Sequence, residues 1–418
     1  MKDRGAEGAL GERSPAGPSS TLRVYGVAAG YGAVAGAVTA VTFALMKGVQ
    51  HLIWDQGEAW WYTAAVILVG GALIAWLRPL ALEVDLDQQL DPGAVQPGHW
   101  RKILVVGLSA VIAVGFGGAI GPEAGLLAVV AELSIIIRDR IARSQAEARL
   151  ITEAGSAAAL SGFYGSPPVG AMYLPEESRQ ESATIGRLPV FCASLSGFAA
   201  FVLVWRLLGM ESHPLELPEG RPEEIISLLA VVPALVGAAL GVGYLLVRYY
   251  LGSVVARLGS VRVQTLVGSV VLAVVLACWP LLRFSGHDDF GVLISQAQAG
   301  AWGVLLAIGA AKVAATALCL ASGWRGGDFF PLMFAGGGVG AAMLALVPSL
   351  GAQAAMVAGM AAATTVGVRK PVAVFVLLWF LVPEVDVMTL VIACVTGILM
   401  LKALPDHPAL AGRGHGSH

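Results

Sequence analysis

The chain has 418 residues, of which 57% are hydrophobic and only 13% are charged, and its mean hydropathy is +0.76. Soluble proteins carry about a quarter charged residues, so this composition predicts a polytopic membrane protein and argues against a soluble enzyme. The formal net charge of −2 argues against nucleic acid as a partner. The four cysteines form no CxxC pair and the seven histidines no HExxH spacing, so we expect no metal site.

Residues 1–20 are polar and rich in Gly, Pro and Ser, which predicts a disordered tail rather than a signal peptide. One transmembrane domain is expected over 21–404, followed by a short tail over 405–418. Its apolar segments are 22–53, 60–77, 103–116, 126–137, 150–163, 169–174, 188–208, 225–251, 261–282, 301–321, 329–347, 354–366, 371–382 and 387–404. Several are shorter than the roughly 20 residues of a straight span, which is typical of the broken helices at transporter binding sites.

A carboxylate interrupts the apolar pattern in the stretch Gly117–Gly125. The run before it carries Glu123 toward membrane depth, where an ionisable residue is expensive and usually functional. Gly121 and Pro122 break the helix, and Pro122 suits the first turn of the next one. A helix that begins there presents free N–H groups and its positive dipole end, which predicts an anion site beside a titratable carboxylate. The alternative is that the glycines only allow tight helix packing and Glu123 is an interfacial residue.

A similar break recurs in the second half of the chain. Gly326–Pro331 precedes an apolar run as Gly117–Gly125 does, and Gly367–Ala373 resembles Gly162–Gly170. The offsets between equivalent prolines are 331 − 122 = 209 and 371 − 167 = 204 residues. The pattern predicts an internal duplication with halves near 21–210 and 225–404, although glycine is common enough for chance matches.

Other polar positions support more than one interpretation. The stretch 138–149 holds four arginines and predicts a cytoplasmic loop, with the N-terminal tail on the same side. Asp328 either caps the helix that begins at Phe329 or is a second titratable group near the anion site. Lys312 lies in an apolar run, where it either pairs with an acid or extends to the membrane interface. Gly336–Gly340 predicts a close helix-packing seam.

Three motifs resemble those of the CLC family of chloride channels and chloride/proton antiporters. The stretch Gly121–Gly125 resembles the family's Gly-Arg-Glu-Gly-Pro element, and Gly327–Pro331 fits its Gly-x-Phe-x-Pro element. The stretch Phe163–Glu177 resembles a segment that ends in a pair of glutamates. The resemblance covers roughly residues 21–404, nearly the whole chain.

The resemblance implies an all-α membrane protein, a homodimer of inverted-repeat subunits in a bacterial plasma membrane, which exchanges chloride for protons without a cofactor. Glu123 stands in the place of the gating glutamate, which competes with the anion and accepts a proton when displaced. Glu177, with Glu176 beside it, matches the inner proton-transfer glutamate of the antiporters, although a solvated helix end has the same pattern. Backbone N–H groups that would bind the anion belong to Gly121, Ala124, Gly125, Gly327, Phe329 and Phe330.

The sequence also departs from the family pattern. Residues 82–90 lack the serine of the family's Gly-Ser-Gly-Ile-Pro element, and no tyrosine follows Tyr250 where an anion-coordinating tyrosine is expected. Pro122 stands in place of arginine, Gly125 in place of proline, and Asp328 in place of an apolar residue. Rival hypotheses are therefore a passive channel, a member with another anion such as fluoride, or a non-transporting protein of the same fold. A membrane-embedded enzyme is disfavoured because no GxSxG, paired-histidine or P-loop motif occurs.

Overall fold

The computed structural model describes residues 18–57, 59–90, 99–172, 187–210, 215, 217, 228–382, 384–404 and 410. Over these residues the regular structure is helical, apart from one isolated bridge between two glycines. Seven of the helices described are long and apolar enough to cross a membrane. The prediction of an all-α, multi-pass membrane protein is confirmed. The predicted tails lie outside the described residues, except for residue 410 and for Pro18, where the first helix already begins.

The helices of the first half follow the expected apolar segments. They are α1 (Pro18–Trp54), α2 (Trp60–Leu90), α3 (His99–Gly115), α4 (Glu123–Ile141), α5 (Gln145–Phe163), α6 (Pro167–Met172) and α8 (Leu188–Leu207). Those of the second half are α10 (Val231–Ala256), α11 (Val261–Cys278), α12 (Phe290–Gln298), α13 (Trp302–Ala321), α14 (Phe329–Leu346), α15 (Ala352–Val368), α16 (Pro371–Leu381) and α17 (Val387–Ala403). Short 3₁₀ turns occupy Pro280–Leu282 and Pro348–Leu350. The sequence analysis did not predict α12.

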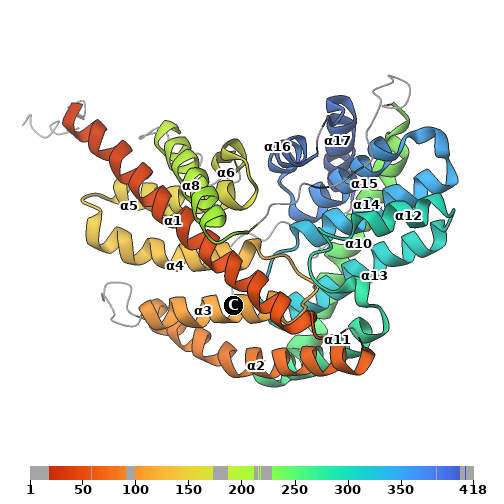
Figure 1. Cartoon of the computed structure of the whole chain (residues 1–418), viewed down its shortest axis with the longest axis horizontal. Coiled ribbons are helices and arrows are strands. Elements are labelled where there is room, and N and C mark those ends of the chain that lie inside the picture. Colours follow the sequence, from red (N-terminus) through yellow and green to blue (C-terminus); the bar gives the residue numbers. More distant parts are fainter. Residues whose placement is uncertain are drawn as a thin grey trace, which may run out of the picture.

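The same packing scheme occurs twice. In the first half α1 packs on α5 and α8, and α4 on α3 and α5; in the second half α10 packs on α15 and α17, and α14 on α13 and α15. The two sets lie on opposite sides of the molecule, with α2, α3 and α11 together at the bottom of the view (Figure 1). The duplication is therefore present in the tertiary structure.

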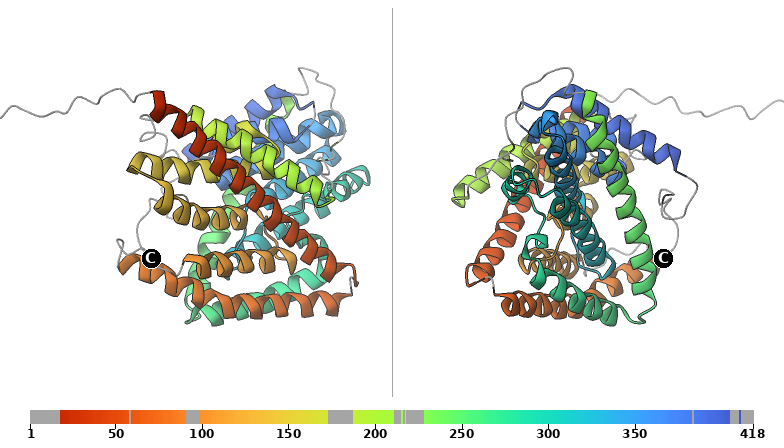
Figure 2. Two further views of the ribbon diagram at one scale, coloured as in Figure 1. Left: turned by 60° about the vertical axis from the view of Figure 1, so that its left-hand side comes forward. Right: turned by 90° about the vertical axis from the view of Figure 1, so that its right-hand side faces the viewer.

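Equivalent helices of the two halves also pack against each other, with their directions reversed. The helices α2 and α11 are in contact, and so are α6 and α16. A Cβ on Gly71 of α2 would overlap Ser269 of α11, whereas Arg78, farther along α2, donates to the carbonyl of Val261 at the start of α11 (3.2 Å). The two helices are thus antiparallel, as an inverted repeat requires, and the second views show them crossing the base of the molecule (Figure 2).

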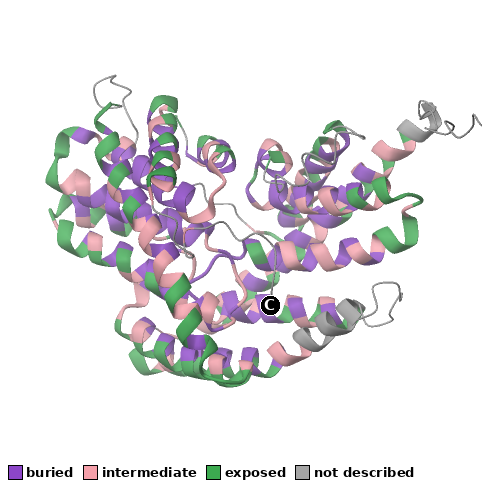
Figure 3. Cartoon of the chain, turned by 180° about the vertical axis from the view of Figure 1, so that it is seen from behind, coloured by how far each residue is buried: buried purple, intermediate pink, exposed green. Residues whose placement is uncertain are grey.

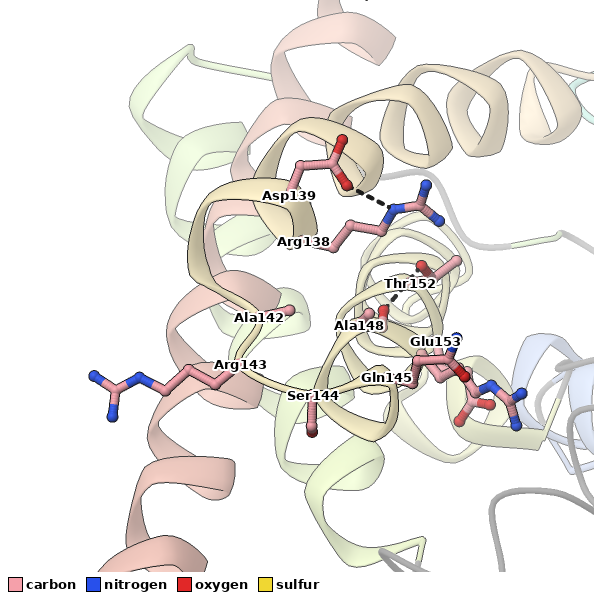
Figure 4. Close-up of a pocket in the computed structure, with 10 residues that line it drawn as sticks. Arg138, Asp139, Ala142, Arg143, Ser144, Gln145, Ala148, Thr152 and Glu153 are labelled. Atoms are coloured by element: carbon pink, nitrogen blue, oxygen red, sulfur yellow. Dashed lines mark hydrogen bonds and ion pairs between the residues drawn. The ribbon is translucent and has the colours of Figure 1, made fainter. Parts of the chain in front are cut away.

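The turn between α4 and α5 marks one side of the membrane domain. The last turn of α4 holds the ion pair of Arg138 with Asp139 (3.1 Å). Arg143 follows in the connecting turn, and Figure 4 shows its side chain pointing away from that pair. Near the start of α1, Arg23 reaches this turn and binds Glu147 (3.2 Å), so both segments lie on one side, as predicted. We call it the arginine-rich side. Because α1 then runs the length of the domain, its end at Trp54 lies on the opposite side.

The core lies where α14 and α15 meet their neighbours. Buried positions follow the inward faces of the helices and exposed positions the outward faces (Figure 3). A Cβ on Gly336 would overlap the carbonyl of Gly359, and one on Gly340 would overlap that of Ala355. The predicted glycine seam is therefore confirmed as the place where α14 and α15 approach most closely.

We expect Gly340→Ala to destabilise the protein by roughly 1–3 kcal/mol, because the new methyl group forces α14 and α15 apart. Gly243→Ala in α10 is the matched control, since no atom lies within 4 Å of the added Cβ, and it should be neutral or slightly stabilising. Thermal unfolding of both variants in detergent checks the difference. Equal midpoints would show that the seam is not tightly packed.

Candidate functional site

Two backbone hydrogen bonds join the sequence motifs that the duplication made equivalent. The N–H of Gly121 donates to the carbonyl of Gly327 (2.8 Å), and the N–H of Gly327 donates to the carbonyl of Gly121 (2.7 Å). This reciprocal pair holds the N-terminus of α4 against the N-terminus of α14. The prediction that these two N–H groups bind an anion is wrong for this structure, because each is already hydrogen-bonded to the other glycine.

The Glu123 side chain fills the space between the two helix ends. It is only 4% exposed, and its Oε1 accepts a hydrogen bond from the backbone N–H of Phe329 (3.0 Å). A Cβ on Gly121 or Gly327 would overlap the carboxyl group, so glycine at both positions leaves room for it. The other oxygen, Oε2, is buried without a hydrogen-bond partner among the described residues. A carboxylate therefore occupies the place where the sequence predicted an anion.

The N–H groups around this carboxylate are those that helices leave unused. The first internal hydrogen bonds are Leu126 N–H to Pro122 O in α4 and Leu332 N–H to Asp328 O in α14 (both 3.0 Å). The earlier N–H groups have no acceptor within their own helix, and the positive dipole ends of both helices point at the carboxylate. Of the predicted donors, Ala124 and Gly125 lie in the first turn of α4, and Phe329 and Phe330 open α14.

A cavity of about 630 Å³ is lined by Pro122, the N-cap of α4, and by Lys47 and Gln50 near the end of α1. Its wall includes Phe330 and Tyr164, whose ring centroids are 5.9 Å apart. At its rim Lys47 of α1 pairs with Asp288 (3.1 Å). Since Lys47 lies near the Trp54 end of α1, this cavity reaches Pro122, the residue before Glu123, from the side opposite the arginine-rich side.

The prediction that Asp328 caps α14 through its side chain is wrong. Asp328 occupies the N-cap position, but its side chain makes no capping hydrogen bond. Its Oδ2 instead accepts from the Tyr244 hydroxyl (2.5 Å) and from Nη1 of Arg248 (2.6 Å), both on α10. The sequence analysis missed these two residues. Their signal was an arginine inside the apolar run 225–251, one helical turn after a tyrosine.

Lys312 has a third arrangement that the two alternatives from the sequence did not include. Its fully buried ammonium group donates to the backbone carbonyls of Leu282, Arg283 and Phe284 (3.1, 3.1 and 2.8 Å). It also lies 5.3 Å from the ring centroid of Phe334. Lys312 therefore fastens the segment between α11 and α12 to α13. The predicted inner glutamates, Glu176 and Glu177, lie outside the described residues.

The sequence profile of the family described as "Voltage gated chloride channel" matches residues 90–402. The chain belongs to this family. The match contains both glycine motifs, Glu123 and nearly all of the second half, so it includes the residues that build the site.

Similarity to individual proteins extends over nearly the whole chain. An H(+)/Cl(−) exchange transporter, ClcA, of Cronobacter sakazakii is 28% identical over 414 residues, which cover 92% of this chain and 86% of that protein. The crystal structure of a slow cyanobacterial Cl⁻/H⁺ antiporter matches with a TM-score of 0.77 at 18% identity and covers 93% of this chain and 96% of that one. A CLC-type fluoride/proton antiporter matches with a TM-score of 0.70 at 17% identity, covering 91% and 96%. These structures have the same fold as this chain.

We expect Lys312→Met to destabilise the protein by roughly 3 kcal/mol or more, since it removes the charged donor that three buried carbonyls share. The exposed Lys402, in the last turn of α17, supplies the control Lys402→Met, which should be within about 0.5 kcal/mol of the parent. Thermal unfolding in detergent measures both. A stable Lys312→Met protein would contradict the structural role and point to a role in the anion pathway.

Proposed function

We propose that this protein exchanges a small monovalent anion, with chloride as the first candidate, for protons across a cell membrane. The observation that carries the proposal is the Glu123 carboxylate, which is held by the Phe329 N–H at the meeting point of two helix N-termini. A site that binds one anionic group by backbone donors can bind another of similar size. The carboxylate and the transported anion would therefore compete for the same donors.

Competition for one site couples the anion to the proton. When an anion takes the donors of α14, the carboxylate must leave, and protonation removes its charge as it does so. Ala124, Gly125, Phe329 and Phe330 are the residues proposed to supply N–H groups to the anion. The cavity lined by Pro122, Phe330 and Lys47 is the proposed route between Glu123 and the opposite side. Glu177, with Glu176 beside it, remains the proposed inner proton station.

The relatives support this reading of the site. The protein named H(+)/Cl(−) exchange transporter is matched over 86% of its length, and both structural neighbours are proton antiporters, one for chloride and one for fluoride. We further propose a homodimer in which each subunit has its own pathway, embedded in a bacterial plasma membrane and working without a cofactor. The outward apolar side chains of α11, among them Leu266, Val270 and Val274, suit contact with lipid or with a second subunit.

Purified protein in liposomes tests the exchange. Anion efflux and internal pH are recorded together with chloride, fluoride, bromide and nitrate. We expect an outward anion gradient to drive protons against their own gradient, and we expect Glu123→Gln to keep anion flux while proton movement falls at least tenfold, because the amide cannot carry a proton. Asp55→Asn, at an exposed carboxylate after α1, is the matched control and should change neither flux.

The other outcomes separate the rival hypotheses. Anion flux without proton movement in the parent protein would mean a passive channel. Coupled flux of fluoride without chloride would keep the mechanism and change the substrate. No flux of any of the four anions would overturn the proposed function and leave a protein that has only the fold.

The oligomeric state has its own test. We expect light scattering after size exclusion in detergent to give a protein mass of two 43.0-kDa chains. A mass of one chain, with transport intact in liposomes at low protein density, would contradict the dimer without affecting the proposed exchange.

A further inference from the structure

A second carboxylate lies next to the first along the backbone. Asp328 directly precedes Phe329, whose N–H holds Glu123, so the two carboxylates flank the same helix end. Glu123 is bound by backbone donors, but Asp328 is bound by side chains: Tyr244 at 2.5 Å and Arg248 at 2.6 Å. The mechanism proposed above assigns roles to Glu123, Glu176 and Glu177 and gives this cluster no role.

The cluster places donors around a single oxygen atom. Tyr244 and Arg248 lie one turn apart on α10, and Nη1 of Arg248 also donates to the Tyr244 oxygen (2.9 Å). The phenol and the guanidinium therefore converge on Oδ2 of Asp328. A guanidinium can only donate hydrogen bonds and keeps its charge, so the pair forms a ready site for an anion. The Asp328 carboxylate occupies that site, as the Glu123 carboxylate occupies the site between the N-termini of α4 and α14.

The cluster lies toward the arginine-rich side, away from the cavity at Lys47. Trp54 and Tyr62 are in contact where α1 is followed by α2, so α2 begins on the side opposite the arginine-rich side. Arg78, farther along α2, therefore lies toward the arginine-rich side. Arg78 binds the carbonyl of Val261, just after the end of α10, and Arg248 lies two turns before that end. Glu123 thus has the Lys47 cavity on one flank and the Asp328 cluster on the other.

Two of the three side chains in the cluster are partly exposed. Tyr244 is fully buried, but the side chains of Arg248 and Asp328 are 34% and 23% exposed. Charged side chains at membrane depth face the bundle interior or a water-filled passage. Among the described residues, the titratable or charged groups that interact with Asp328 are Glu123 of α4 and Tyr244 and Arg248 of α10. An ion that arrives from the arginine-rich side would meet this cluster before Glu123.

We propose that Asp328 is a second gating carboxylate, and that Tyr244 and Arg248 bind the transported anion when Asp328 is protonated or swings away. This inference rests on the proposed function. Exchange of the carboxylate for an anion leaves one negative charge opposite Arg248, so the site stays electrically balanced in both states. The anion would pass from the Tyr244–Arg248 donors to the backbone donors of α14, and one carboxylate would have to leave at each step.

Chloride binding by the purified full-length protein, measured by isothermal titration calorimetry, tests the proposal. Asp328→Asn removes the competing charge and keeps the side-chain size, so we expect chloride to bind about tenfold more tightly. Asp328→Ser is a second variant with the same expectation, because serine is favoured at an N-cap and should preserve α14. Unchanged or weaker chloride binding in both variants would overturn the proposal.

The donors are tested in the Asp328→Asn protein. Adding Arg248→Met should reverse the gain in chloride affinity, whereas adding Arg257→Met, at the exposed C-cap of the same helix, should leave it in place. Equal effects of these two substitutions on chloride affinity would contradict the assignment of Arg248 as a donor to the anion. Parent protein and Glu123→Gln are titrated and assayed for flux in parallel. If neither binds or moves chloride, the proposed function fails as well; if both do, a negative result concerns Asp328 alone.

Discussion

The reciprocal hydrogen bonds between Gly121 and Gly327 are the contact on which the site depends. They hold two helix N-termini, one from each half of the chain, in direct hydrogen-bonding contact, although the two glycines are some 200 residues apart in the sequence. A side chain at either position would displace the carboxyl group of Glu123, which takes the space beyond both α-carbons. The bridge therefore sets the distance between α4 and α14, and the glycines set the volume left between them.

That arrangement explains how a carboxylate can be stable at membrane depth. Burial of a charge without compensation is prohibitive, but unused N–H groups and two converging helix dipoles supply the compensation here. Those donors do not distinguish a side-chain carboxylate from a free anion of similar size. Asp328 is also held by hydrogen-bond donors, but these are the side chains of Tyr244 and Arg248 on the neighbouring helix. Two flanking carboxylates on one helix end are thus held by two different kinds of donor.

The inverted duplication produces this geometry from two halves that contain equivalent helices. Because α2 meets α11 and α6 meets α16, each half packs on the counterpart of its own elements. The same operation brings the two glycine breaks together. In the second half, Lys312 also fastens the segment before α12 to α13 through three carbonyls.

The sequence by itself determined the fold class, the helices other than α12, the duplication, and the place of Glu123 at the start of a helix, because hydropathy, Gly/Pro breaks and a lone carboxylate at membrane depth are local signals. It could not determine which N–H groups remain free: Gly121 and Gly327 were predicted to bind an anion and instead bind each other. Nor could it place Asp328, since an N-cap preference is local, whereas Arg248 lies 80 residues away in the chain. Partners distant in sequence depend on how helices pack, and only the tertiary structure decides that.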